Sequence, residues 1–226
     1  YTLSLHDALP IFGREVGKHY IRRGEWHKAK EHLLRAQKRL SHDYTSVKNA
    51  EALYYLGNVY AILGEREKAE DAYWTATWTP AYKHRSFYEL AVTATQEKDY
   101  SKALELITQS LHVGVRDKQA LMLKAYVCRM LGEREKALET IQNVEQIDPL
   151  DLWCQAEKYF IQIRITIQND PLKEELLSRN HGFIAVQELL EVITDYNTLG
   201  AYDDALTLLE EALSVGASAK DRKSVV

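Results

Sequence analysis

A segment of 34 residues is repeated along the middle of this chain, and this period constrains the fold more than any other feature. The hexapeptide Gly64–Ala69 (Gly-Glu-Arg-Glu-Lys-Ala) returns unchanged as Gly132–Ala137, two periods later. The variant Lys98–Ala103 lies midway between them, so the alanine that ends each copy recurs at an even spacing. A fixed period of this size is typical of stacked supersecondary units. We therefore expect a repeat protein whose core is a continuous strip between layers.

Short turns and alanines mark each repeat. Equivalent alanines are Ala29, Ala69, Ala103, Ala137 and Ala205. The turns before them begin with Gly24, Gly64, Lys98, Gly132 and Gly200. Each unit is predicted to hold an apolar-periodic helix that ends near the turn and a second helix that carries the alanine. Glycine supplies the left-handed conformation that ends the first helix, and the acidic residues after most of the turns favour the start of the second.

The small residues have a packing explanation. Two antiparallel helices joined by so short a turn lie close together, so only a small side chain fits where their axes approach. The small residues expected on the facing helix, twelve positions before the alanine, are Gly17, Gly57, Ala91 and Ala125.

The second unit resembles the tetratricopeptide repeat family. The residues that carry the resemblance are Leu53, Leu56, Gly57, Tyr60, Gly64, Ala69, Tyr73 and Ala76, and Pro149 falls where that family places its closing proline. The resemblance covers almost all of residues 12–220. It implies an all-α fold, a right-handed α-solenoid of about six helix-turn-helix repeats with a concave groove lined by the first helix of each unit. The units are expected at about residues 12–43, 50–83, 84–117, 118–151, 152–182 and 183–219.

The fifth unit departs from the pattern, because Pro171 occupies its alanine position. Asp170 and Pro171 form a helix start, so the second helix of this unit is expected to begin late. The segment before it, residues 151–168, is rich in β-branched residues that also suit a strand, but the phase of its neighbours favours a helix. A sixth unit follows as residues 183–199 and 202–215. Residues 44–48 are an insertion relative to the period.

The two ends of the chain share one DNA sequence read in opposite directions. Leu5–Ile11 can be encoded as CTACACGACGCTCTTCCGATC, and the opposite strand then encodes Asp221–Val226 followed by a stop codon. Residues 1–11 and 221–226 therefore resemble a translated sequencing adapter, and they are excluded from the reasoning on fold and function. We expect the natural protein to continue beyond Phe12 and Lys220. The alternative is a natural disordered terminus at each end.

Composition gives little support for several classes of partner. The formal net charge is −4, with 29 basic and 33 acidic residues, so no electrostatic argument favours nucleic acid or an acidic membrane. No apolar run approaches the roughly 20 residues of a membrane span. Cys128 and Cys154 match no metal or redox spacing and are expected to be buried free thiols. This favours a reducing compartment such as the cytoplasm.

Residues with catalytic or metal-binding chemistry are scattered. Seven histidines were considered as ligands, namely His19, His27, His32, His42, His84, His112 and His181. His27 and His32 are five positions apart, which does not place them on one helical face as metal ligands. Gly57 and Gly64 do not have the spacing of a phosphate-binding loop. We therefore expect no catalytic residue, metal or cofactor site in this chain, while a parent protein could still be an enzyme.

The family resemblance implies which side chains face the groove. They are Arg14, Lys18, Glu51, Tyr54, Asn58, Arg85, Tyr88, Gln119, Met122, Tyr126 and Arg129. Aromatic and Arg side chains are frequent at interface hot spots. Equally, these residues could only cover the inner face. The two-carboxylate clamp that some family members use on chaperone tails is matched only by Asn58, with Tyr54 where that clamp has Lys, so chaperone tails are not expected as partners.

Two functions remain from the sequence. In the first, the chain is a non-catalytic scaffold that binds a peptide or a partner domain in its groove. In the second, it is an accessory module of a carbohydrate-processing protein. The second follows from four runs that look like the helical repeats of large bacterial proteins, in which a β-rich domain similar to carbohydrate-active enzymes lies upstream. These runs are Tyr73–Trp78, Phe87–Ala91, Ile147–Asp151 and Tyr202–Leu206.

Overall fold

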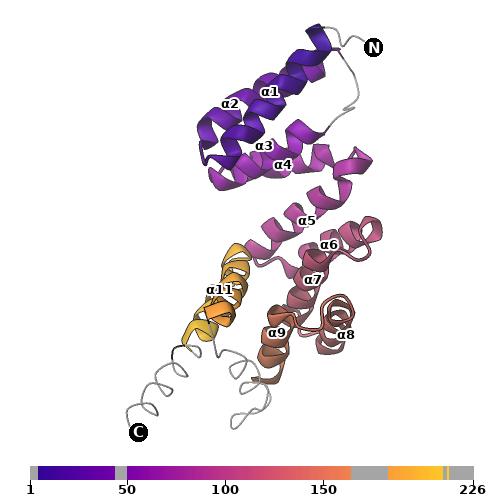
Figure 1. Ribbon diagram of the computed structural model, residues 1–226. Coiled ribbons are helices and arrows are strands. Elements are labelled where there is room, and N and C mark those ends of the chain that lie inside the picture. Colours follow the sequence, from indigo (N-terminus) through magenta and orange to yellow (C-terminus); the bar gives the residue numbers. More distant parts are fainter. Residues whose placement is uncertain (1–4, 44–49, 164–182, 211–212, 214–226) are drawn as a thin grey trace. The chain divides into compact units, whose positions relative to one another are not determined.

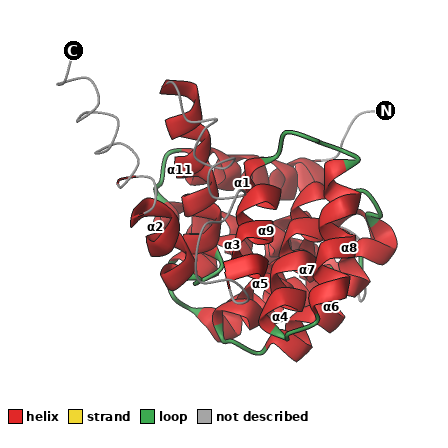
Figure 2. Cartoon of the chain, turned by 90° about the horizontal axis from the view of Figure 1, so that it is seen from below, coloured by secondary structure: helices red, strands yellow, loops and turns green. Residues whose placement is uncertain are grey.

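The computed structural model describes residues 5–43, 50–163, 183–210 and 213, and every regular element there is a helix (Figure 1). Figure 2 shows helices and connecting loops, and no strand, in that part of the chain. The predicted all-α fold is therefore confirmed. Three predictions lie outside the described residues: the insertion at 44–48, the late second helix that begins at Pro171, and the origin of residues 221–226.

The chain divides into two compact units. Unit 1 comprises Tyr1–Ala91 and Thr108–Val115, and unit 2 comprises Val92–Ile107 and Arg116–Val226.

Unit 1 is built from helix pairs that correspond to the first predicted repeats. It contains α1 (Leu5–Arg22), α2 (Trp26–Asp43), α3 (Glu51–Ile62), α4 (Arg66–Ala76) and the larger part of α5 (Pro80–Gln96). Helix α1 packs on α2, α3 packs on α4, and α2 contacts α3. Helix α1 begins at Leu5, so residues 5–11 continue the first helix, and their non-native origin stays a prediction.

Unit 2 repeats this arrangement. It contains most of α6 (Tyr100–Val113), then α7 (Lys118–Met130), α8 (Arg134–Glu145), α9 (Leu152–Ile163) and α11 (Phe183–Thr198), and residues 202–210 are also helical. Helix α7 packs on α8, and α9 contacts α7, α8 and α11. The β-branched segment after Asp151 is helical as far as Ile163, so the helix prediction is right for its described part.

Five turns share one backbone geometry. The residues at the turn position have φ between 62° and 79°: Gly24, Gly64, Lys98, Gly132 and Gly200. At the second turn, the Gly64 N–H donates to the Ala61 carbonyl (3.1 Å) and the Glu65 N–H donates to the Tyr60 carbonyl (2.9 Å). The same two bonds recur at the other four turns. This is the Schellman motif, which uses a left-handed residue to satisfy the last carbonyls of a helix.

The repeated alanines lie in the first turn of the second helices. The Ala69 N–H donates to the Glu65 carbonyl (3.1 Å), and the four equivalent alanines make the equivalent bond. All five are at most 4% exposed: Ala29, Ala69, Ala103, Ala137 and Ala205. The prediction that these residues are wedged between helices is confirmed.

The small residues of the facing helix lie under a large side chain. A Cβ atom on Gly57 would lie 2.4 Å from Cε1 of Tyr73, and a Cβ atom on Gly17 would lie 2.6 Å from Cγ of Leu33. Tyr73 and Leu33 each stand four positions after the repeated alanine, one helical turn further along the same buried face. The glycine therefore makes room for this large residue as well as for the alanine, which refines the prediction.

We predict that Gly57→Ala destabilises the chain by about 1–3 kcal/mol, because the new methyl group displaces the buried Tyr73 ring. Gly13→Ala is the matched control, because its Cβ would meet Ala36 Cβ at an ordinary 3.5 Å. That control should stabilise the helix by about 0.5–1 kcal/mol, since glycine is costly within helices. Urea denaturation followed by circular dichroism measures both values. Equal stability of the two variants would contradict the packing described here.

Candidate binding surfaces

The described residues offer no cluster typical of a metal site. No group of three or more His, Cys, Asp and Glu side chains there could hold a metal ion. None of the helices in the described ranges is long and apolar enough to cross a membrane. Cys128 and Cys154 are free and buried, as predicted. Burial raises the pKa of both thiols, so they are protonated and weakly reactive at neutral pH.

A Ser–His contact in unit 1 has a structural explanation. Ser110 Oγ lies 2.8 Å from Nδ1 of His84 and donates to the His84 backbone carbonyl at 2.9 Å. Ser110 is fully buried, and a Cβ on Gly114 would lie 2.6 Å from the His84 ring. Because a substrate has no access to a fully buried hydroxyl, this contact ties α5 to α6 and does not form a nucleophilic site.

The predicted groove residues of unit 1 come from three first helices, α1, α3 and α5. We call this set the unit 1 face: Arg14, Lys18, Glu51, Tyr54, Asn58, Arg85 and Tyr88.

Helices α1 and α3 are joined through one carboxylate of the unit 1 face. Arg14 Nη1 lies 2.9 Å from Glu51 Oε2, and Lys18 Nζ lies 2.9 Å from Glu51 Oε1. Hydrogen bonds to Glu15 and to Glu51 raise the pKa of Lys18. The ammonium of Lys18 also lies 5.7 Å from the centre of the Tyr55 ring. Arg14 and Lys18 are therefore held in place by internal partners.

Tyrosines and an acid join α3 to α5 and α4. The Tyr54 hydroxyl donates to Glu89 Oε1 at 3.2 Å, and the Tyr54 ring centre lies 5.5 Å from that of Tyr82. Burial, with the nearby charge of Glu89, raises the pKa of Tyr54 to about 12. Burial also raises the pKa of the Glu89 carboxyl. From α4, the Tyr73 hydroxyl donates to Asn58 Oδ1 at 3.0 Å. Tyr54 and Asn58 are thus positioned by contacts within the fold.

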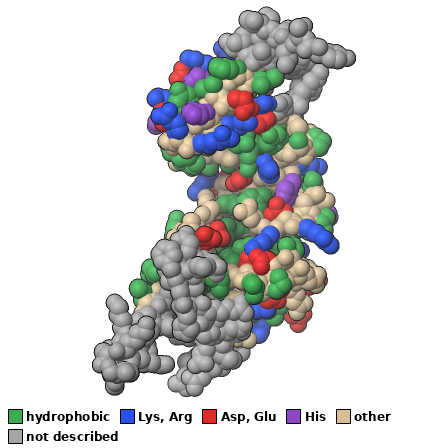
Figure 3. All heavy atoms as spheres, in the orientation of Figure 1, with side chains coloured by type: hydrophobic (Ala, Val, Ile, Leu, Met, Phe, Trp, Pro, Cys, Tyr) green, Lys and Arg blue, Asp and Glu red, His purple; other side chains and the backbone are tan. Residues whose placement is uncertain are grey.

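Arg85 differs from the other predicted groove residues of unit 1 because it is exposed, while Tyr88 beside it is half-buried. The charge of Arg85 acts on the Tyr54 hydroxyl and favours its ionised form. The unit 1 face therefore presents an exposed guanidinium next to positioned tyrosines. On the side shown in Figure 3, basic, acidic and His side chains lie intermingled over the described residues.

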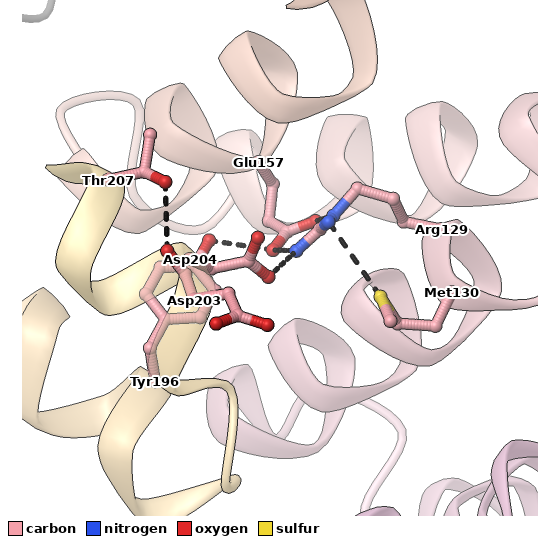
Figure 4. A network of polar contacts seen from close by, with 7 residues as sticks. All are labelled: Arg129, Met130, Glu157, Tyr196, Asp203, Asp204 and Thr207. Carbon is pink, nitrogen blue, oxygen red and sulfur yellow. Dashed lines mark hydrogen bonds and ion pairs between the residues drawn. The ribbon is translucent and has the colours of Figure 1, made fainter. Parts of the chain in front are cut away.

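The predicted groove residues of unit 2 lie in a different environment. Arg129 of α7 forms a two-point contact with Glu157 of α9, with Nε–Oε2 at 2.7 Å and Nη2–Oε1 at 3.0 Å. Both side chains are buried, with 5% and 0% of their surface exposed. Nη2 of Arg129 also donates to Asp204 Oδ2 at 2.6 Å, and the Tyr196 hydroxyl donates to Glu157 Oε1 at 2.6 Å. Figure 4 shows these groups converging from α7, α9, α11 and the helix of residues 202–210.

Aromatic rings enclose this buried ion pair. The guanidinium carbon of Arg129 lies 5.0 Å from the ring centres of both Tyr126 and Phe160. The Tyr196 ring packs against Tyr126, Phe160 and Trp153, with ring centres 5.7–6.1 Å apart.

The expectation of an open groove does not fit Tyr126 and Arg129. Tyr196 of α11 packs against Tyr126, and Asp204 of the following helix accepts from Arg129, so both residues are covered within unit 2. On the same helix, Met122 is half-buried and Gln119 is exposed. Whether any of these residues binds a partner stays a prediction.

No role was predicted from the sequence for Glu157, Tyr196 or Asp204, although the sequence carries a signal for two of them. Glu157 is an acid within the apolar helix Leu152–Ile163, which indicates a buried pair. Asp204 stands immediately before the alanine of its unit. In four other units lysine occupies that place: Lys28, Lys68, Lys102 and Lys136.

We predict that Arg129→Ala destabilises the chain by about 3–5 kcal/mol, because it leaves the Glu157 carboxylate buried without its cation. Arg134→Ala, at an exposed position on α8, is the control and should change the stability by no more than about 0.5 kcal/mol. Urea denaturation measures both effects. A loss below about 1 kcal/mol for Arg129→Ala, the range of exposed pairs, would show that the pair is not buried as described.

The sequence model described as tetratricopeptide repeat matches residues 17–77. No curated protein sequence matches the chain.

Three solved structures illustrate the likeness in fold. Pseudomonas aeruginosa pilF has 16% identity and a TM-score of 0.64, with 94% of this chain and 99% of that chain covered. YrrB, described as a TPR protein with an unusual peptide-binding site, has 17% identity and a TM-score of 0.57, with 92% and 94% covered. MamA from Desulfovibrio magneticus RS-1 has 18% identity and a TM-score of 0.58, with 84% and 96% covered.

Identities this low establish the fold alone, whereas the family match rests on the sequence of residues 17–77. The five left-handed turns and the buried alanines extend the same repeat through the other described residues. Residues 17–77 therefore match the tetratricopeptide repeat family, and the fold of the chain is similar to that of a solved tetratricopeptide repeat protein.

Proposed function

We propose that the chain is a non-catalytic protein-interaction scaffold and that the unit 1 face binds a peptide segment of a partner protein. The match of residues 17–77 to the tetratricopeptide repeat, a repeat that binds proteins, supports the scaffold role. The described peptide-binding site of YrrB, a protein of the same fold, supports the peptide as ligand.

The observation that carries this proposal is the exposed Arg85 beside tyrosines that are already held in place. Tyr and Arg contribute a large share of the energy at protein interfaces. Tyr54 is positioned by Glu89, and Asn58 by Tyr73. Ordered side chains lose little conformational freedom when a ligand binds, which leaves more of the contact energy for affinity.

The charges of the unit 1 face favour an acidic peptide. Its cations are Arg14, Lys18 and Arg85, and its one carboxylate, Glu51, already pairs with the first two. Burial raises the pKa of the neighbouring Glu89, which reduces its tendency to be charged. A carboxylate of the partner can form a charge-assisted hydrogen bond with the exposed Arg85.

Other partners have weaker support. Nucleic acid is not expected, because binding to a phosphate backbone needs an excess of basic side chains, whereas the formal net charge of the chain is −4 and charges of both signs are mixed on the side shown in Figure 3. The alternative role, an accessory module of a carbohydrate-processing protein, stays a prediction, since no contact among the described residues bears on it.

We predict that Arg85→Glu weakens the binding of peptides selected from a displayed random library on the whole chain. The loss should be at least about tenfold in Kd, which corresponds to about 1.4 kcal/mol and is typical of an Arg hot spot. Fluorescence anisotropy of the labelled peptides measures the Kd.

Lys83→Glu is the matched control for this experiment. Lys83 is also exposed, and its replacement by Glu changes the net charge by the same amount. It lies two positions before Arg85 on α5, which places it about 200° away around the helix axis. It should bind the selected peptides as the wild type does. The proposal would be wrong if no peptide is selected, or if the two variants bind equally well.

A further inference from the structure

We propose that unit 2 holds a second binding surface, for a helical partner segment that presents a tyrosine hydroxyl and a carboxylate. The surface is the Arg129 cluster, defined as Tyr126 and Arg129 of α7 with Trp153, Glu157 and Phe160 of α9. Its resident ligand is the C-terminal pair, defined as α11 and residues 202–210. A partner of the same chemistry displaces this pair, so the contact is autoinhibitory.

The Arg129 cluster is complete without the C-terminal pair. Arg129 and Glu157 neutralise each other through two parallel contacts, a geometry that fixes both planar groups. Tyr126 and Phe160 each lie 5.0 Å from the guanidinium, within cation–π range. All of these groups come from α7 and α9, so these two helices alone form a polar centre within an aromatic rim.

The C-terminal pair adds one donor and one acceptor to atoms that already have partners. Glu157 Oε1 accepts from Arg129 Nη2 and also from the Tyr196 hydroxyl. Arg129 Nη2 donates to Glu157 and also to Asp204. The Tyr196 ring packs against those of Tyr126, Trp153 and Phe160, and Figure 4 shows Tyr196 beside Glu157 and Asp204. The C-terminal pair thus contacts the Arg129 cluster as a ligand contacts a binding site. A competing partner must present the same groups, a phenol hydroxyl and a carboxylate beside it.

The position of the C-terminal pair differs from ordinary stacking of repeats. In a solenoid each repeat contacts only its neighbours. Here Tyr196 reaches α7 as well as α9, and Gln96 Nε2, at the end of α5, donates to the Thr198 carbonyl at 2.8 Å. The pair therefore lies across several first helices of unit 2, on the side where the family resemblance implies the groove.

Two further features distinguish the C-terminal pair. Asp204 replaces the lysine that four other units carry before the alanine, and this exchange supplies the carboxylate for Arg129. The pair also keeps an exposed apolar stripe, spaced by four and three positions: Tyr202, Leu206 and Leu209.

Occupancy by the C-terminal pair lowers the apparent affinity for any competing segment. Only the fraction of molecules with the pair displaced can bind a partner at the Arg129 cluster, so the apparent Kd rises as that fraction falls. Weakening the pair should therefore tighten binding in trans, the reverse of what loss of a direct contact would do.

The test uses the whole chain and a fluorescein-labelled synthetic peptide of residues 183–213 as the probe. Asp204→Asn removes the carboxylate that holds the C-terminal pair to Arg129 and leaves the Arg129 cluster intact. We predict that this variant binds the probe at least about tenfold more tightly than the wild type, measured by fluorescence anisotropy. A probe that itself carries Asp204→Asn should bind this variant at least about tenfold more weakly than the unaltered probe does. Each tenfold step corresponds to about 1.4 kcal/mol.

Asp203→Asn is the matched control, because Asp203 is the adjacent exposed acid and its side chain makes no contact in Figure 4. It should bind the probe as the wild type does. The proposal is overturned if Asp204→Asn binds no more tightly than the wild type, or if both variants gain equally. If Asp204→Asn loses its helical circular dichroism, Tyr196→Phe takes its place with the same prediction, because it keeps the ring and removes the hydroxyl.

Discussion

The close approach of paired helices is the constraint on which the rest of this structure depends. Helices joined by a three-residue turn cannot separate, so a hydrogen atom or a methyl group must stand where they meet. Gly57 meets the ring of Tyr73, Gly17 meets Leu33, and the repeated alanines are fully buried on the second helices. This contact fixes the register of each pair, and the register decides which side chains of the first helices are free for other contacts.

Much of the fold could be read from the sequence because its causes are local. A left-handed residue at each turn and an alanine five positions later act within one or two helical turns, so their spacing alone predicts them. The same argument correctly identified α9 as a helix despite its β-branched residues, because the phase of its neighbours fixes the expected element. Lys98 shows how strong this constraint is, since it adopts φ = 62° where the other turns have glycine.

The binding surfaces were harder to predict because their contacts are not local. Arg14, Lys18 and Glu51, which the family resemblance places on the groove, form ion pairs with one another. Periodicity carries no information on which element covers a face. Arg129 pairs with Glu157 28 positions later and with Asp204 75 positions later, so these contacts depend on how α9 and the helix of residues 202–210 pack against α7. The chain thus carries two kinds of surface. One, in unit 1, offers an exposed cation, and the other, in unit 2, is filled by the chain itself.

The central claim is that paired helices, with a left-handed residue at the turn within each pair, recur through the described residues. The free energy of unfolding of Lys98→Gly tests it most directly, because an L-residue in the left-handed region costs about 1–2 kcal/mol that glycine does not incur. After the added flexibility of glycine in the unfolded chain, which offsets about 0.5–1 kcal/mol, a net stabilisation of about 0.5–1 kcal/mol is expected. A lower stability of Lys98→Gly would contradict the account, since it would mean that this turn does not share the geometry of the others.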